Sequence, residues 1–214
     1  MKGLLKITAL LMTVFMLFGL ASCDLLGGED KVQKQEYQAA SEAYAELSSV
    51  HDSCVTIMDS IYNAWHFSIY KYDDYSTYTG LNEFSDAVGI SKSELRSTLE
   101  TLSDTVGITD YVLYGILEDF SVAANLVVEV YKARGTFDEM EASISTAKAK
   151  LKEVTPTYAD YTGYDTLKDY YSEVAAYAEF CESPTGSFEM LKTTIDNYET
   201  NLRNYRNDLS FVFD

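Results

Sequence analysis

The sequence predicts an all-α protein: an elongated antiparallel bundle of long amphipathic helices that follows an N-terminal leader. Three observations lead to this fold class. Apolar residues recur at alternating steps of three and four, which is the spacing of one face of a helix. Only two prolines occur in 214 residues, and their scarcity permits long helices. No alternating apolar run typical of a strand stands out.

The leader covers the first 22 residues and is typical of a secretory signal. Lys2 and Lys6 precede an apolar stretch over 7–20, and the small residues Ala21 and Ser22 follow. A charged start, a short apolar run and small residues at the cleavage point define such signals. A membrane span needs about 20 apolar residues, so we expect this shorter run to serve export only.

The end of the leader, Leu20-Ala21-Ser22-Cys23, resembles the lipobox of bacterial lipoproteins. In that class a diacylglycerol is attached to the cysteine thiol, and cleavage occurs just before the cysteine. The resemblance implies a signal peptide over 1–22, a lipidated tether over 23–30 and a single helical bundle over 31–214. It places the domain on the extracytoplasmic side of the cell membrane or outer membrane. The alternative is an ordinary secretory signal that ends beside a chance cysteine.

The acidity of the chain excludes one class of partner. The net charge is −18, and cleavage before Cys23 removes two lysines and no acidic residue, which gives −20. Nucleic-acid binding needs a basic surface, so we exclude it. The negative charge also repels anionic headgroups. We therefore expect the domain to stand off the bilayer and to be tied to it by lipid on Cys23.

The first predicted helix covers 31–72, and a loop without periodicity is expected over 73–90. The helix is indicated by an apolar stripe with steps of three and four. Its members are Leu47, Val50, Cys54, Ile57, Ile61 and Ala64.

A capping box, Ser91-Lys92-Ser93-Glu94, opens the next helical stretch. Gly107 interrupts that stretch, but the apolar stripe keeps its phase from Val106 to Leu113. We therefore expect two nearly collinear helices, or one kinked helix, over 91–134. The stripe consists of Leu95, Leu99, Leu102, Val106, Leu113, Leu117, Phe120, Ala124, Val127 and Tyr131.

The C-terminal half predicts two further long segments. Gly135 fits a helix end, and Thr136-Phe137-Asp138-Glu139 matches a second capping box. The segment over 136–183 carries a stripe through Leu167, Tyr171, Val174, Ala178 and Cys181, and Gly163 is expected to loosen it. The last helix has a heptad stripe suited to packing against other helices. That stripe is Phe188, Leu191, Ile195, Tyr198, Leu202, Tyr205, Leu209 and Val212.

The stretch from Pro156 to Met190 carries a second resemblance. It holds Pro-x-Tyr, Tyr164, Leu167-Lys168, Tyr171 and the turn Pro184-Thr185-Gly186-Ser187. This pattern resembles the C-terminal half of uncharacterised helical lipoproteins from gut-type bacteria. The resemblance covers this stretch and the signal, and it implies the helical fold and the envelope location but no activity.

The sequence offers little reactive chemistry. His51 and Cys54 share a helix face, so a catalytic Cys-His pair is one interpretation and a buried histidine beside a buried thiol is the other. Metal-ligand and phosphate-binding motifs are absent from the sequence, so we expect no cofactor and no enzyme activity. In a simple up-down bundle Cys54 and Cys181 lie too far apart to pair, which predicts two free buried thiols.

The 18 tyrosines are the most unusual feature of the sequence. At helical positions such as Tyr171, Tyr198 and Tyr205, packing on the core explains them. Tyr70, Tyr72, Tyr75 and Tyr78 instead lie among Ser, Thr, Gly and Asp, a composition typical of recognition loops. The alternative for these four is a solvated loop that folds back on the bundle.

Two functions follow as hypotheses. The first is a non-enzymatic, membrane-anchored spacer or binding module that presents a tyrosine-rich, acidic tip to an envelope protein or glycan. The second is a sensor or substrate-binding domain with a pocket between helices near Gly107 and Gly163. A filled core with an exposed aromatic end favours the first, and a large apolar cavity beside those glycines favours the second.

Overall fold

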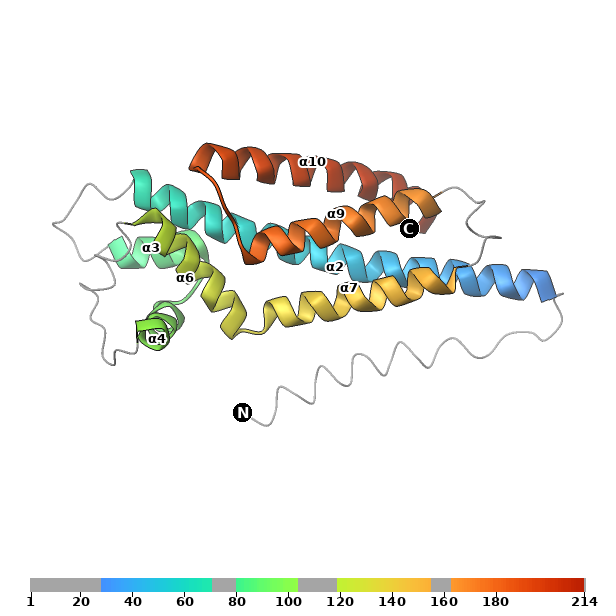
Figure 1. Ribbon diagram of the computed structural model, residues 1–214, viewed down its shortest axis with the longest axis horizontal. Helices are drawn as coiled ribbons and strands as arrows, with labels where there is room; N and C mark the ends of the chain where they lie inside the picture. The colour runs from blue at the N-terminus through green and yellow to red at the C-terminus, as the bar shows by residue number, and fades with distance from the viewer. Residues whose placement is uncertain (1–27, 71–79, 104–118, 155–162, 214) are drawn as a thin grey trace. The chain divides into compact units, whose positions relative to one another are not determined.

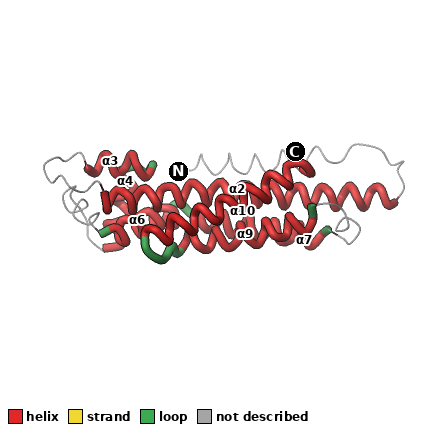
Figure 2. Tube along the Cα trace, turned by 90° about the horizontal axis from the view of Figure 1, so that it is seen from above, coloured by secondary structure: helices red, strands yellow, loops and turns green. Residues whose placement is uncertain are grey.

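The computed structural model describes residues 28–70, 80–103, 119–154 and 163–213 (Figure 1). Its contacts separate residues 1–35, of which the structure describes only 28–35, from residues 36–214. The packing discussed below lies within 36–213. The described residues form helices and no strand, which confirms the all-α prediction (Figure 2).

The first described helix, α2, runs over Gly28–Tyr70. All six residues of its predicted stripe are buried, from Leu47 to Ala64. Burying such a stripe against other helices is the main source of helix stability in a protein of this kind, since isolated helices gain little from propensity alone. The periodicity of this segment therefore identified the buried face correctly.

The predicted loop over 73–90 is wrong from residue 80 onward, because helix α3 occupies Gly80–Val88. Phe84 and Val88 lie four apart and are both buried, so one face of this short helix contributes to the core. Residues 71–79 lie outside the described part of the chain.

Helix α4, Lys92–Ser103, begins at the predicted capping box. The Glu94 amide donates to Ser91 Oγ at 3.3 Å, and the Ser91 amide donates back to Glu94 Oε2 at 3.3 Å. The two residues thus satisfy each other's free backbone donors, as the sequence predicted.

The expectation of nearly collinear helices over 91–134 is wrong. Helix α6, Phe120–Ala133, packs against α4. Arg134 at the end of α6 forms an ion pair of 3.0 Å with Glu94 at the start of α4. The end of α6 thus lies beside the start of α4, so the two helices are folded back against each other and are not collinear. Gly107 lies outside the described residues.

A second reversal divides the predicted segment over 136–183. Helix α7, Thr136–Glu153, packs against α9, Tyr164–Glu182, and the Tyr164 hydroxyl donates to the Leu151 carbonyl at 3.3 Å. The start of α9 thus lies beside the end of α7, so the two are antiparallel. Gly163 precedes α9 with a φ of 111°, a left-handed conformation that favours glycine.

The junction of α6 and α7 combines one correct and one incorrect prediction. Gly135 ends α6 as expected, with a φ of 77°. The second capping box is wrong, because Gly135 itself occupies the cap position and Thr136 is already the first helical residue. No side chain caps α7, so its start is defined by the left-handed glycine.

Helix α10, Phe188–Phe213, completes the bundle and packs against α9. The ribbon gives the direction of each partner of α2: α7 and α10 run antiparallel to α2, α6 runs obliquely antiparallel, and α9 runs parallel to it (Figure 1). The contacting pairs are Tyr37–Val212, Tyr44–Arg206 and Tyr62–Phe188 for α10, Ser60–Tyr131 for α6, Glu42–Lys150 for α7, and Tyr44–Tyr170 and Cys54–Cys181 for α9.

The sequence predicted the buried face of α10 more accurately than the buried face of α9. In α10 the leucines and Ile195 of the heptad stripe are buried in the chain's own core, and its tyrosines pack partly buried against it. In α9 the fully buried tyrosines are Tyr170 and Tyr177, whereas Tyr171, which the sequence placed on the stripe, is only partly buried. Among the described helices, none is long and apolar enough to cross a membrane.

Candidate functional site

The predicted site residues are only partly within the described chain. Cys23, Tyr72, Tyr75 and Tyr78 lie outside it. Tyr70 is the last residue of α2 and is 59 % exposed. The structure therefore places one of the four candidate binding tyrosines, and it places that one on the surface.

Tyr70 belongs to a group of aromatic rings in mutual contact that we call the aromatic ladder: Tyr62, His66, Tyr70 and Phe188. The first three recur at steps of four along α2, which puts them on one helix face. The ring centroids of His66 and Tyr70 are 4.8 Å apart, and those of Tyr62 and His66 are 6.0 Å apart.

Phe188, the first residue of α10, lies against the other three rings of the ladder. Its centroid is 5.2 Å from that of Tyr62, 6.2 Å from that of His66 and 6.1 Å from that of Tyr70. The side chains of Tyr62, His66 and Phe188 are half-buried. The ladder is thus a preformed surface in which each ring restricts its neighbours.

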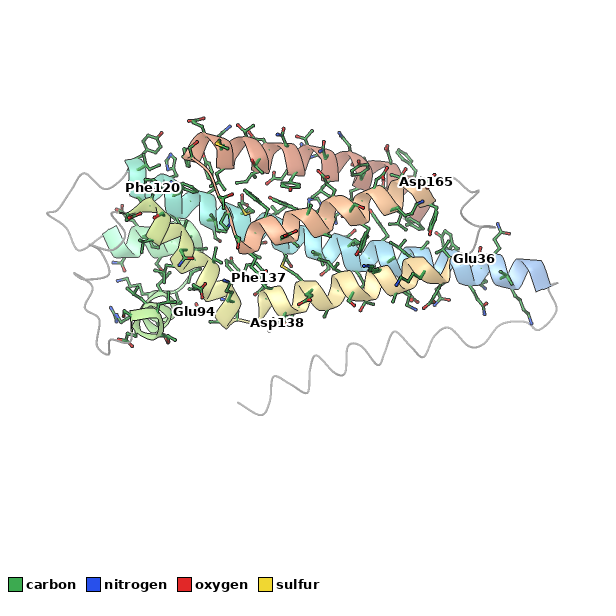
Figure 3. The ribbon with its side chains drawn as sticks, viewed as in Figure 1. Glu36, Glu94, Phe120, Phe137, Asp138 and Asp165 are labelled. Atoms are coloured by element: carbon green, nitrogen blue, oxygen red, sulfur yellow. The ribbon has the colours of Figure 1, made fainter. Side chains whose placement is uncertain are left out.

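The ladder rests on a second aromatic stack. Trp65 is buried, and its ring stacks on that of Phe120 at 5.2 Å with an interplanar angle of 13°. Phe120 begins α6 and is 42 % exposed (Figure 3). Asp119 fixes this helix start, because its carboxylate accepts hydrogen bonds from the backbone of Ser121 and Val122.

Sequence reasoning missed the partners of Tyr70 in this surface. The step of four from Tyr62 to His66 to Tyr70 was readable as a helix face. Phe188 and Phe120 come from helices that begin more than 45 residues later in the chain, so their positions depended on the two chain reversals. The sequence offered no local signal for them.

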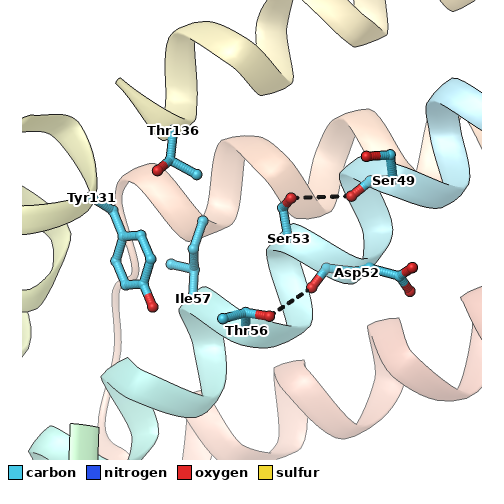
Figure 4. A pocket seen from close by; sticks show the side chains of 7 residues that line it. All are labelled: Ser49, Asp52, Ser53, Thr56, Ile57, Tyr131 and Thr136. Atoms are coloured by element: carbon cyan, nitrogen blue, oxygen red, sulfur yellow. Dashed lines mark hydrogen bonds between the residues drawn. The ribbon is translucent and has the colours of Figure 1, made fainter. Parts of the chain in front are cut away.

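A hydroxyl-lined groove of about 290 Å³ lies between α2 and the junction of α6 and α7 (Figure 4). Its lining consists of Ser49, Asp52, Ser53, Thr56, Ile57, Tyr131 and Thr136. The groove does not include Gly163, where an added Cβ atom would lie 3.3 Å from the Val212 side chain, and Gly107 lies outside the described residues. Its volume lies just below the usual range for ligand pockets, which begins at about 300 Å³.

Most hydrogen-bond donors in the groove already donate to other groups of the protein. The Ser53 hydroxyl donates to the Ser49 carbonyl at 3.1 Å, and the Thr56 hydroxyl donates to the Asp52 carbonyl at 2.9 Å. The Asp52 carboxylate pairs with Arg206 at 2.7 Å. These contacts lie within the protein, so the groove offers few unused polar groups to a ligand.

His51 and Cys54, the candidate catalytic pair, each contact a different residue of α9. His51 is buried, and its Nδ1 atom lies 3.3 Å from the Tyr170 hydroxyl. The Cys181 thiol instead lies 3.7 Å from the Cys54 carbonyl oxygen, and both cysteines are fully buried and free. The structure favours the interpretation of a buried histidine beside a buried thiol.

The expected separation of Cys54 and Cys181 is wrong, although the prediction of two free buried thiols agrees with the structure. The error comes from the predicted path of the chain. Because α9 is a separate helix that ends at Glu182, Cys181 lies beside the middle of α2 instead of its end.

Burial lowers the pKa of His51 below its ordinary value of 6.5, and the positive charges of Arg206 and Arg203 act in the same direction. Asp52 acts in the opposite direction. The folded protein therefore holds His51 neutral at a pH at which the unfolded chain has already bound a proton.

We expect the free energy of unfolding to fall as the pH decreases below about 6.5, because the unfolded chain then binds a proton that folded His51 resists. The slope from His51 is at most about 1.4 kcal/mol per pH unit. Urea unfolding of the wild type and of His51→Gln between pH 7.5 and 5 measures this contribution. The variant should show the shallower slope, and equal slopes would exclude His51 as a source of the pH dependence.

The described residues contain no group of three His, Cys, Asp or Glu side chains placed to hold a metal ion. Comparison with protein-family models, with curated proteins and with solved structures found no match to this chain.

Proposed function

We propose that this chain is a membrane-anchored envelope lipoprotein that acts as a non-enzymatic spacer or binding module. Its lipid anchor is Cys23, and its binding surface is the aromatic ladder together with the tyrosine-rich segment that follows Tyr70. The partner is an envelope protein or a glycan on the extracytoplasmic side.

The aromatic ladder is the observation that supports binding. Tyr70 is 59 % exposed and lies beside three half-buried rings, and contiguous exposed apolar surface on a soluble protein often marks an interaction site. Aromatic side chains offer wide, rigid contact area at a low cost in conformational entropy, which is why they dominate binding hot spots. The stacking within the ladder orders the rings in advance, so binding does not have to order them.

The chemistry of the ladder fits both partner classes. The negative π-faces of the rings attract the C–H faces of a sugar ring, and the same rings fill apolar pockets on a protein. The ring nitrogens of His66 and the hydroxyls of Tyr62 and Tyr70 supply hydrogen bonds at the edge of the surface. The acidity of the chain disfavours an anionic partner.

The alternative is a sensor or substrate-binding domain, and the hydroxyl-lined groove is the observation that favours it. A small neutral polyol is the ligand class that would suit it, because the lining hydroxyls still have lone pairs to accept hydrogen bonds. The sensor or substrate-binding function is the weaker candidate, because the hydrogen-bond donors of the groove already donate to other groups of the protein. A rise in melting temperature with added polyol that is lost in Thr56→Val would support it.

Removing the aromatic rings tests the binding proposal. We expect His66→Ser/Tyr70→Ser and Tyr72→Ser/Tyr75→Ser/Tyr78→Ser each to lower the affinity at least about tenfold, which corresponds to about 1.4 kcal/mol. The assay immobilises the full-length chain in detergent. It measures retention of purified cell-wall glycan in one arm and of envelope proteins, identified by mass spectrometry, in the other.

Phe211→Ser is the matched control, because Phe211 is 91 % exposed and lies near the opposite end of α10 from Phe188. It removes an exposed ring of the same kind without touching the ladder. Equal recovery of every partner by all four proteins would remove this end of the bundle from consideration as a binding surface.

A further inference from the structure

Two thiols from distant parts of the sequence meet in the core of the bundle. Cys54 lies in the middle of α2, and Cys181 lies in the last turn of α9, 127 residues later. The Cys181 sulfur is 3.7 Å from the carbonyl oxygen of Cys54, and both side chains have no exposed surface. The neighbouring Cys54 is also one of the groups that raise the pKa of the Cys181 thiol.

This contact places the sulfur atoms close to one another. Within one residue, covalent geometry keeps the side-chain sulfur within a few ångströms of the backbone carbonyl oxygen, at about 3–5 Å. The Cys181 sulfur, 3.7 Å from that oxygen, therefore lies within about 9 Å of the Cys54 sulfur. A disulfide needs the two Cα atoms within about 7 Å of one another and the sulfurs at bonding distance, so the bond closes by rotation about the Cα–Cβ bonds and an approach of α2 and α9 to that spacing.

We propose that Cys54 and Cys181 form a disulfide that ties α2 to α9 when the chain folds in the presence of a disulfide oxidant. One thiolate attacks a low-molecular-weight or protein disulfide and forms a mixed disulfide with it. The second thiolate displaces the remaining leaving thiol and closes the Cys54–Cys181 bond. The two cysteines lose two protons and two electrons, and the external disulfide is reduced to two thiols.

The surroundings of the pair determine when this reaction takes place. Burial and the neighbouring Cys54 raise the pKa of the Cys181 thiol, so few thiolates form in the docked bundle. Tyr177, one helical turn before Cys181, is fully buried as well. The bond therefore forms while the helices dock, when thiolate and oxidant still have access, and the packed core afterwards protects it from reduction.

The consequence for stability follows from the length of chain that the bond closes. A disulfide across a loop of this size removes many conformations of the unfolded chain. We expect the melting temperature of the oxidised protein to exceed that of the reduced protein by about 5–15 °C.

The test uses the full-length chain, unfolded in detergent and denaturant and then refolded with an excess of oxidised over reduced glutathione. Free thiols are then alkylated, and the protein is digested without reductant. Mass spectrometry should find a linked pair of peptides that contain Cys54 and Cys181, two hydrogens lighter than their sum. Cys23 does not interfere, because digestion places it on a different peptide.

The variants Cys54→Ser and Cys181→Ser are the controls, and neither should show a melting temperature that depends on reductant. The proposal is overturned if wild-type Cys54 and Cys181 are recovered alkylated or as separate glutathione adducts. It is also overturned if the linked protein melts at the same temperature as, or below, the reduced protein, since the bond would then not suit the native packing.

Discussion

The variant Cys23→Ala should move the protein from the membrane fraction to the soluble fraction. The proposed diacylglycerol on the Cys23 thiol would supply two acyl chains, and two chains give stable anchoring where a single chain gives only marginal binding. The acidic chain has no compensating attraction to anionic headgroups. We therefore expect the membrane-bound share to fall more than about tenfold once the acylated thiol is removed.

Fractionation of cells that express each protein, followed by a high-salt wash of the membranes, measures this change. Cys181→Ala is the matched control, because it removes a thiol of the same kind without touching the leader, and its product should stay in the membrane pellet. Mass spectrometry of the wild type should find fatty acyl groups on the peptide that begins at Cys23. A Cys23→Ala variant that stays equally firmly in the pellet would contradict the lipoprotein proposal.

The sequence was most informative where a single helix buries one face throughout its length. The stripes of α2 and α10 were legible because regular steps of three and four place residues such as Leu47 and Leu202 on one side of a helix. The capping box at Ser91 was also legible, because it depends only on residues three apart.

The two chain reversals could not be predicted from the sequence, and the reason is physical. An apolar period determines which side of a helix is buried, but two helices in phase along the sequence can be collinear or folded back on one another. The stripe on either side of Gly107 fits both arrangements. The packing of α4 against α6 is instead marked by the long-range contact of Glu94 with Arg134, which no local pattern encodes.

The candidate site was affected in the same way. Tyr70 could be proposed from the local composition, whereas the rings of Phe188 and Phe120 joined the site only through the fold. The contact of Cys54 with Cys181 was missed for the same reason, because its distance was inferred from a straight third segment. The buried face of a single helix was predictable from its own sequence, whereas the contacts between two helices depended on the turns that connect them.

We expect Leu95→Ala to lower the free energy of unfolding by about 2–5 kcal/mol, and Leu102→Ala to lower it by less than about 1 kcal/mol. Both leucines lie on the stripe that the sequence predicted and on the same helix, α4. Leu95 has no exposed surface, whereas Leu102 is 49 % exposed. Removing the first side chain leaves a cavity in the core, but removing the second gives up only part of its burial.

The comparison tests whether α4 and α6 fold back against each other, because nearly collinear helices that kept one continuous buried face would bury both leucines alike. Urea unfolding followed by circular dichroism gives the two changes in free energy, and for a domain of this size the larger one corresponds to a melting temperature lower by about 5–15 °C. Equal, large losses in the two variants would show that Leu102 is packed as well as Leu95, and the helix pair would then have to be redrawn as a single straight segment.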